Sequence, residues 1–259
     1  MKCRLCGAEA WDFGHLKMLH RVEVSYFRCT RCEYVQTEQP HWLEAAYSSA
    51  LSALDVGAVS RNKRFEVVTQ AIIQAFLNSD GRYVDYGGGH GLFVRLMRDR
   101  GFDFLWSDKY AENLYARGFE HAPSSGPLAG VTAFEVFEHL VDPAGEIAQM
   151  LAMAPNLFFS TMLMPPSLPK PGEWWYYVPE TGQHVGIFAE ASLRWVAREH
   201  GLHFNTNGVG LHLFSKNPVH PLAFKFLSKM RVAGPINCLR QRPALTGTDF
   251  ELLKRDAYS

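Results

Sequence analysis

The pattern of apolar and polar positions divides the chain into a short β-rich start, two helices and a longer region of alternating elements. Residues 22–28 (VEVSYFR) alternate in polarity and predict a strand of a small ribbon. Residues 41–53 and 64–77 carry apolar side chains at helical spacing, and the turn-forming residues 78–81 (NSDG) end the second helix. These two helices are expected to link the ribbon to the rest of the chain.

From residue 82 onward, short apolar runs alternate with segments of helical periodicity. The strand candidates are residues 82–86, 103–107, 130–137 and 155–163, and residues 118–120 are the candidate for a further, obscure strand. The helix candidates are residues 92–100, a segment opened by Asp142-Pro143, and residues 192–200. Asn207-Gly208 lies between strand-like runs in residues 201–216 and predicts a hairpin. This alternation predicts an α/β fold with helices on both faces of the sheet.

We therefore divide the chain into a ribbon (1–40), linking helices (41–80), a main α/β domain (81–216) and a helical tail (217–259). The tail contains basic residues among apolar helix-forming segments. A helical cap, a dimer contact and a docking element for a carrier all remain open as its role.

Composition and charge limit the classes of partner. The chain has 259 residues, 47% of them hydrophobic, which is enough for one α/β domain and a small attachment. Lys+Arg and Asp+Glu both number 26, so there is no global positive field to attract nucleic acid, and a small molecule or glycan is the expected substrate. No apolar run reaches the roughly 20 residues of a transmembrane helix, and the start MKCRLC does not resemble a signal peptide. A cytoplasmic protein is expected, with homo-oligomerisation left open.

Four cysteines form two close pairs, Cys3-x-x-Cys6 and Cys29-x-x-Cys32, which are separated by 22 residues. Two such knuckles can supply the four sulfur ligands of a tetrahedral Zn²⁺ site. Four cysteines leave no open position on the metal, so the predicted zinc is structural. The alternatives are four unrelated thiols, or a site in which His15 or His20 replaces one ligand.

A glycine-rich loop follows the strand candidate 82–86 and precedes a helix. It contains Asp85, Gly87, Gly88, Gly89 and Gly91. The dinucleotide fingerprint G-x-G-x-x-G fails because Leu92 occupies its sixth position. The arrangement Asp-x-Gly-x-Gly-x-Gly instead resembles the first motif of class I S-adenosylmethionine (SAM)-dependent methyltransferases, which implies a Rossmann-like sheet and a loop that cradles the methionine part of SAM. The alternative is a glycine turn of another α/β protein.

Asp108 ends the next strand candidate, 17 residues beyond Gly91. An acidic residue at the tip of the second strand can accept both hydroxyl groups of a ribose. The methyltransferase resemblance implies this role for Asp108. The alternative is that Asp108 caps a helix that begins at Ala111.

A cluster of titratable residues, Glu135-x-x-Glu138-His139, lies where the strand candidate 130–137 ends, and His184 follows downstream. These residues resemble the metal site of small-RNA 3′-terminal 2′-O-methyltransferases and of ubiquinone-pathway O-methyltransferases. The resemblance implies that Glu135, Glu138, His139 and His184 hold Mg²⁺, which would activate a hydroxyl group for methyl transfer. In the metal-free alternative, Glu135 contacts the cofactor loop and His139 acts as a general base or packs in the core. Glu138, His139 and His184 are the candidate catalytic residues in either case.

A long irregular segment, residues 164–184, carries four adjacent aromatic residues: Trp174, Trp175, Tyr176 and Tyr177. A segment of this length within a compact domain is usually functional. These side chains could form a platform for a sugar or another flat ring, or a lid that only packs on the core.

Several stretches together resemble a bacterial methyltransferase family associated with polysaccharide and glycan biosynthesis. They are the cysteine ribbon, YSS at Tyr47, LDVGAVSRN at Leu51, VDYGGGHG, SDKYAENL, FEVFEHL and WWYYVPETGQH. The resemblance implies O-methylation of a sugar or glycan hydroxyl, with Arg61-Asn62 near the SAM carboxylate. The alternatives are an RNA-terminal 2′-O-methyltransferase and a non-catalytic zinc-ribbon scaffold.

Overall fold

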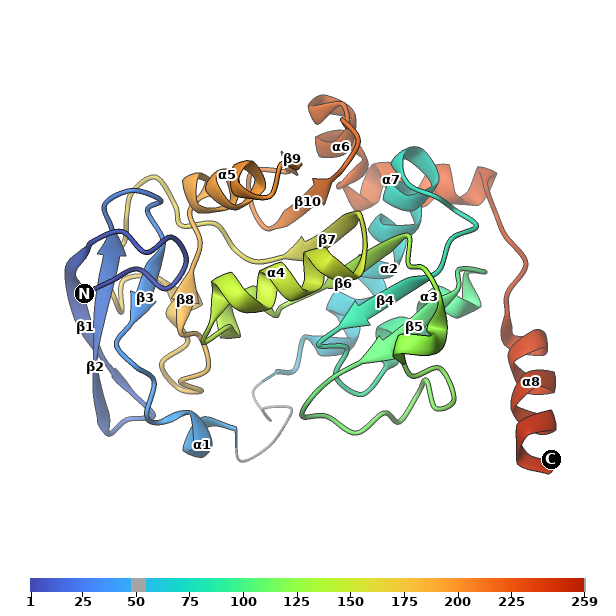
Figure 1. Cartoon of the computed structure of the whole chain (residues 1–259), viewed down its shortest axis with the longest axis horizontal. Coiled ribbons are helices and arrows are strands. Elements are labelled where there is room, and N and C mark those ends of the chain that lie inside the picture. Colours follow the sequence, from blue (N-terminus) through green and yellow to red (C-terminus); the bar gives the residue numbers. More distant parts are fainter. Residues whose placement is uncertain (48–54, 259) are drawn as a thin grey trace.

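The computed structural model describes residues 1–47 and 55–258 (Figure 1). The helix expected over residues 41–53 is represented in the described part by a single turn, α1 (Leu43–Ala46). The remainder of that prediction, and part of the motifs quoted at Tyr47 and Leu51, lie outside the described residues.

The N-terminal residues form a four-stranded antiparallel sheet in the order β1-β2-β3-β8. Three of its strands come from the ribbon: β1 (Ala10–Met18), β2 (Val22–Cys29) and β3 (Val35–Thr37). The fourth, β8 (Gly186–Ile187), comes from the main domain and pairs with β3. The ribbon and the main domain therefore share one sheet, as the left side of Figure 1 shows.

The main sheet has six strands in the order β5-β4-β6-β7-β10-β9. The strands β5 (Phe104–Ser107), β4 (Tyr83–Tyr86), β6 (Gly130–Ala133) and β7 (Asn156–Ser160) are parallel. The hairpin β9 (His203–Thr206) and β10 (Leu211–Ser215) joins β7 in antiparallel pairing. The carboxyl ends of four parallel strands therefore lie along one edge of the sheet.

Helices cover both faces of this sheet. The helices α2 (Ala58–Phe76) and α3 (Leu92–Asp99) share one apolar core with Phe158, and α4 (Pro143–Met153) and α5 (Glu190–Glu199) share the other with Leu157 and Phe159. Neighbouring residues of β7 face opposite cores because side chains alternate along a strand. The predicted fold class, a Rossmann-like sheet with helices on both faces, is confirmed.

Of two local predictions, the hairpin matches named strands and the strand at residues 118–120 does not. The Asn207 side chain accepts hydrogen bonds from the backbone N–H groups of Val209, Gly210 and Leu211, at 2.9–3.1 Å, and so closes the β9–β10 hairpin. The obscure strand at residues 118–120 is present only as a single parallel bridge between Trp106 and Glu120. Three short 3₁₀ turns complete the main domain: Pro123–Ser125, Phe137–His139 and Trp175–Tyr177.

The tail forms three helices, α6 (Pro221–Leu227), α7 (Met230–Leu239) and α8 (Thr246–Tyr258). The helix α7 lies along α2, and the Asn237 side chain donates a hydrogen bond to the carbonyl oxygen of Val67 at 2.8 Å. The helix α8 is anchored to α3 by an ion pair of 2.6 Å between Arg98 and Asp249, two residues that are both almost fully buried. Among the described residues, no helix is long and apolar enough to cross a membrane.

Candidate active site

The glycine loop connects β4 to α3 at the carboxyl edge of the main sheet. Gly87, Gly89 and Gly91 have positive φ angles, which a residue with a side chain adopts only with strain. A Cβ atom at Gly87 would lie 2.7 Å from Val136, and one at Gly91 would lie 2.6 Å from Asn113. A Cβ atom at Gly89 would meet no other atom within 4 Å. The loop is therefore packed against protein at its two ends and open at its centre, as a ligand cradle requires.

Asp85 lies buried beneath this loop. Its carboxylate accepts a hydrogen bond of 2.6 Å from the hydroxyl group of Thr132 on β6. Burial, together with the negative charge of Asp108, raises the pKa of Asp85 to about 7 although the hydrogen bond from Thr132 lowers it. Gly88 is required next to it, because a Cβ atom at this position would lie 2.8 Å from the Asp85 carboxylate.

Asp108 connects the tip of β5 to the centre of the loop. Its Oδ2 accepts a hydrogen bond of 2.9 Å from the backbone N–H of Gly89, and its Oδ1 accepts from Tyr110 and Ala111. No helix begins at Ala111, so the helix-cap interpretation of Asp108 is wrong, and the aspartate closes a turn instead. Oδ2 has one donor and keeps acceptor capacity for a further hydrogen bond.

Sequence reasoning missed Trp106, which lies two residues before Asp108. The indole Nε1–H of Trp106 donates a hydrogen bond of 2.8 Å to the carbonyl oxygen of Gly89. Gly89 is therefore held from both sides, its N–H by Asp108 and its carbonyl group by Trp106. A tryptophan in an apolar strand gives no sequence signal for this role.

Glu135 follows a strand that is shorter than predicted. The strand β6 ends at Ala133, and Glu135 has a φ of 56°, which interrupts the extended backbone. Its N–H donates to Ser160 at 2.8 Å, and the Ser160 hydroxyl donates to its carboxylate at 2.5 Å. Its second carboxylate oxygen lies 3.6 Å from Nε of Arg61. Burial, followed by the charge of Glu138, raises the pKa of Glu135.

Glu138, His139 and His184 come together beyond Glu135. One ligand atom from each of the three lies within 4.8 Å of the others, whereas Glu135 is not part of this group. The His139 and His184 rings are 5.0 Å apart. The Glu138 side chain is fully buried, and neither of its oxygens has a hydrogen-bond partner among the described residues. A buried carboxyl group without partners is costly, so this arrangement is suited to a cation.

The hydrogen-bond partners of the two histidines bear on their tautomers. Nδ1 of His184 lies 2.7 Å from the carbonyl oxygen of Tyr176, and Nδ1 of His139 lies 3.1 Å from that of Gln183. Because a carbonyl oxygen can only accept, Nδ1 of His184 carries the proton and its Nε2 keeps a free lone pair. Nδ1 of His139 also lies 3.0 Å from the Tyr47 hydroxyl group, which can donate or accept, and His139 has a free Nε2 in the tautomer that donates to Gln183. Burial, followed by the charge of His139, lowers the pKa of His184 to about 3, so His184 is neutral at physiological pH. This tautomer is the one that metal-binding histidines adopt.

Tyr47 is a further site residue that sequence reasoning did not assign. Its hydroxyl group lies 3.0 Å from Nδ1 of His139, and its ring stacks at 6.3 Å with that of the exposed Tyr110. Burial, followed by the charge of Glu138, raises the pKa of Tyr47 above its usual range. Tyr47, which follows α1, therefore lies beside His139, with the two ring centres 6.3 Å apart.

The four aromatic residues of the long segment separate into two pairs. Tyr176 and Tyr177 are buried, with 2% and 0% of their surface exposed, whereas Trp175 is 68% exposed and Trp174 is half-buried. The Tyr176 hydroxyl group accepts a hydrogen bond from the N–H of Met162, and that of Tyr177 donates to the carbonyl oxygen of Pro169. The two tyrosines therefore pack in the core, as the lid alternative expects. Only the two tryptophans could form a platform for a sugar or another flat ring.

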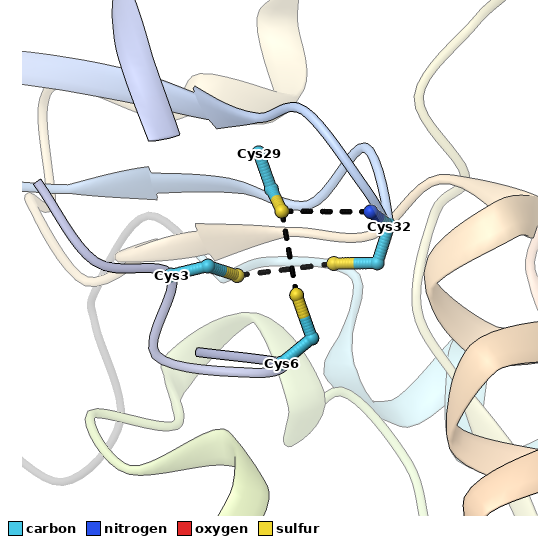
Figure 2. A group of neighbouring side chains, drawn as sticks. All are labelled: Cys3, Cys6, Cys29 and Cys32. Carbon is cyan, nitrogen blue, oxygen red and sulfur yellow. Dashed lines mark hydrogen bonds between the residues drawn. The ribbon is translucent and has the colours of Figure 1, made fainter. Parts of the chain in front are cut away.

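The four paired cysteines converge between the ends of the ribbon strands, as Figure 2 shows. All four Sγ atoms lie within 4.8 Å of one another. The shortest separations are 3.4 Å between Cys6 and Cys29 and 3.8 Å between Cys3 and Cys32, so no disulfide is present among them. Burial raises the pKa of Cys6, and the hydrogen bond with Cys32 lowers the pKa of Cys3 to about 5. This arrangement fits a tetrahedral metal site.

Comparison with protein families assigns the main domain. A family model described as "Methyltransferase domain" matches residues 60–205, which is more than half of the chain. The chain belongs to this methyltransferase family, and the prediction of a SAM-dependent methyltransferase is confirmed at this level. A comparison with curated proteins finds no match.

Solved structures similar to this chain include several methyltransferases. An O-methyltransferase family 2 protein from Planctomyces limnophilus, in complex with apigenin, is 17% identical over 66% of this chain and 63% of its own, with a TM-score of 0.46. Magnesium protoporphyrin IX methyltransferase from Synechocystis with bound SAH is 13% identical over 68% of this chain and 93% of its own, with a TM-score of 0.44. The match therefore spans less than two thirds of the first of these proteins.

Proposed function

We propose that this methyltransferase transfers the methyl group of SAM to a hydroxyl group of a sugar or glycan. The observation that carries the proposal is the group formed by Glu138, His139 and His184. Its first member, Glu138, lies two residues after Val136, which is packed against the glycine loop at Gly87. The loop would place the methyl donor, and the group would hold the acceptor oxygen. Proximity of this kind supplies much of the catalysis of a one-step displacement.

We propose that SAM lies along Asp85, Gly87, Gly88, Gly89 and Gly91, with its ribose on Asp108. The open space at Gly89 and the free acceptor capacity of Asp108 support this placement. When bound, SAM supplies an electrophilic methyl group on a sulfonium ion.

The carboxylate end of SAM needs a cationic partner. Arg61 lies at the start of α2, where its guanidinium group is paired bidentately with Asp55 and lies near Glu135. We infer that Arg61 orients the methionine part of SAM and that Glu135 lies on the cofactor side of the site.

Glu138, His139 and His184 would hold a divalent cation. Such a cation, when bound, would lower the pKa of a coordinated hydroxyl group and fix its position. Because Glu135 is not part of the group, the donor set is two imidazoles and one carboxylate, which favours Mn²⁺, Fe²⁺ or Zn²⁺ over the Mg²⁺ expected from the sequence. In the metal-free alternative, Nε2 of His139 takes the hydroxyl proton and Glu138 stabilises the imidazolium that forms.

Chelation separates the metal-assisted and metal-free reactions. Activity is measured after EDTA treatment and after addition of Mn²⁺, Zn²⁺ or Mg²⁺, with the zinc content of the ribbon determined in each sample. The proposal expects activity to disappear in EDTA and to return with Mn²⁺ or Zn²⁺. Full activity in EDTA, at unchanged ribbon zinc, would overturn the metal-assisted reaction and leave the metal-free alternative with His139 as the base.

The acceptor is tested by mass spectrometry of candidate glycans, in which each methyl transfer adds about 14 daltons. An RNA 3′ end is the second candidate acceptor, because its vicinal hydroxyl groups would also suit a metal held by Glu138, His139 and His184. Affinity for an RNA falls steeply with salt, whereas affinity for a neutral glycan does not. A steep salt dependence would favour the RNA.

We further propose a structural Zn²⁺ on Cys3, Cys6, Cys29 and Cys32, supported by the convergence of their sulfur atoms. The proposed units remain a ribbon (1–40), linking helices (41–80), a SAM-binding domain (81–216) and a helical tail (217–259). Metal analysis of the purified protein is expected to give one zinc per chain.

A further inference from the structure

Arg4 lies inside the first cysteine knuckle but points its side chain toward the main domain. Its guanidinium group donates hydrogen bonds to the carbonyl oxygens of Val185, at 2.8 Å, and of Val141, at 3.3 Å. Val185 directly follows His184, and Val141 lies two residues after His139. One cation from the ribbon therefore binds both backbone segments that carry the histidines of the proposed metal group.

The peptide groups of Val185 complete the connection. The N–H of Val185 donates to the carbonyl oxygen of Glu138 at 2.9 Å, and its carbonyl oxygen also accepts from the N–H of Thr37 on β3 at 3.1 Å. The backbone of Arg4 is itself fixed, because its N–H donates to the Gln36 side chain at 2.7 Å. Hydrogen bonds through Val185 thus link the cysteine knuckle to the carbonyl group of Glu138, and they hold the backbone directly after His184 and two residues after His139.

We propose that Arg4 is a positioning residue, through which the cysteine ribbon fixes the relative placement of Glu138, His139 and His184. This inference rests on the proposed metal group. A metal site needs its ligands at fixed separations, and groups behind the ligands typically change metal affinity by about 10- to 100-fold when removed. The ribbon would then be an integral part of the active site rather than an independent module.

Arg4→Met tests this role, because it keeps the length of the side chain and removes its donors. Arg31→Met is the control, because Arg31 is the arginine inside the second knuckle, between Cys29 and Cys32, and its side chain is exposed. Both variants are expected to retain one zinc and the melting temperature of the main domain. Only Arg4→Met is expected to weaken Co²⁺ binding at Glu138, His139 and His184, by about tenfold or more. Arg4→Lys replaces the two-pronged guanidinium group with a single ammonium group. Its affinity for Co²⁺ is expected to lie between those of the wild type and Arg4→Met.

Hydrogen exchange of the Val185 amide gives a readout that does not depend on metal. Metal-free Arg4→Met is expected to exchange this amide at least about tenfold faster than Arg31→Met, with unchanged exchange in β4 and β7. Equal exchange in the two variants would overturn the inference. If exchange differs but the wild-type protein binds no metal at these residues, the positioning role stands and the metal proposal fails.

A different feature, the charge of the tail, carries a second inference. No acidic residue occurs between Glu199 and Asp249, whereas six basic residues do: Lys216, Lys225, Lys229, Arg231, Arg240 and Arg242. The only acidic residue of the packed helix α2 is Glu66, which is almost fully buried and paired with Arg100. Arg242 is paired with Asp80, and the other five basic residues leave this part of the protein positive, although the chain as a whole is neutral.

The same region exposes large apolar side chains. Leu222 and Phe226 are 72% and 57% exposed, and their spacing places them on one face of α6 together with the exposed Lys225. Lys229 and Met230, at the start of α7, continue this exposed surface. Among the described residues, neither lysine takes part in an ion pair. The surface formed by Leu222, Lys225, Phe226, Lys229 and Met230 is called the α6 face below.

We propose that the α6 face binds an anionic membrane surface. Apolar side chains flanked by lysines match the acyl boundary and the headgroups of anionic lipids. A second copy of the chain fits less well, because a twofold contact would place the same positive charges opposite each other. Nucleic acid would use the lysines but would leave Leu222 and Phe226 in water.

Vesicle flotation tests this surface. The protein is expected to float with vesicles that contain phosphatidylglycerol and not with pure phosphatidylcholine. Replacing Lys225 and Lys229 with glutamate is expected to weaken binding by at least about 20-fold, since each lysine near the surface contributes about fivefold. Phe226→Ser should also weaken it. Lys17→Glu with Arg21→Glu, two exposed ribbon residues, is the charge-matched control and should bind normally.

Four results would overturn the proposal. The first two are the absence of flotation with either vesicle and equal flotation with both. The third is a dimer that forms without lipid and is abolished by Phe226→Ser, and the fourth is binding to an RNA oligonucleotide without binding to vesicles.

Discussion

Metal binding at Glu138 should reverse which of two proteins, the wild type or Glu138→Met, is the more stable. The Glu138 side chain is fully buried, and its two oxygens have no hydrogen-bond partner among the described residues. A buried polar group without a partner costs about 1–3 kcal/mol. Glu138→Met, which keeps the length of the side chain, should therefore raise the free energy of unfolding of the metal-free protein by about 2 kcal/mol. For a chain of this size this is a rise of about 4–8 °C in Tm.

Metal should stabilise the wild-type protein but not the variant. At a metal concentration of about 100 times Kd, binding adds about 2.7 kcal/mol to the stability of the folded state. The wild-type protein should then be at least as stable as Glu138→Met, although it is less stable without metal. Thermal unfolding followed by circular dichroism, with the ribbon zinc loaded, measures the stability of both proteins with and without Mn²⁺. Glu199→Met, at the exposed end of α5, is the control and should change stability by less than about 0.5 kcal/mol.

Two results would refute this reasoning. One is that Glu138→Met destabilises the metal-free protein, which would mean that the carboxyl group has a favourable partner. The other is an equal rise in Tm with metal for both proteins, which would place the metal elsewhere.

Three further predictions concern the cofactor loop, a buried aspartate and the ribbon. Gly89→Ala should fold, because a Cβ atom there meets nothing, but should weaken SAM binding by at least about tenfold in calorimetry, whereas Gly91→Ala should lower Tm through its clash with Asn113; normal SAM affinity in folded Gly89→Ala would contradict the cradle. The pKa of Asp85 is raised on folding to about 7, so the folded state binds the extra proton, and this contribution to stability is complete below about pH 4 and is lost as the pH rises to 7. Asp85→Asn should remove this pH dependence, which is about 4 kcal/mol in total for a shift of about three pKa units, and of which about 3 kcal/mol falls between pH 5 and pH 8. Denaturant unfolding over that pH range measures it, and parallel pH profiles of the two proteins would contradict the raised pKa. Cys32→Ser should lose zinc in metal analysis and unfold the ribbon, with faster hydrogen exchange in β1 and β2; full zinc content in that variant would contradict the four-sulfur site.

Much of the fold could be predicted because its signals are local. The glycine loop lies between a short apolar strand and a helix, and each of these has its own periodicity. The hairpin at Asn207-Gly208 was predicted for the same reason, since the turn chemistry lies within four residues. The shared sheet could not be predicted, because β8 has only two residues and pairs with a strand about 150 residues earlier. Pairing over such a distance leaves no trace in local periodicity.

The candidate site divides in the same way. The sequence placed Glu138 and His139 in one predicted metal site with His184. The structure brings these three residues together. Glu135 had the same sequence signal, but its left-handed backbone and its bond with Ser160 direct it elsewhere. The roles of Arg4 and Tyr47 depend entirely on tertiary contacts.

Isothermal titration of the zinc-loaded protein with SAM tests the central claim most directly, because the assignment of the glycine loop underlies every later step. We predict binding of one SAM per chain, and binding at least about tenfold weaker in a folded Gly89→Ala, whose melting temperature falls only by the small cost of a left-handed alanine. A folded, zinc-loaded wild-type protein that binds no SAM would contradict it.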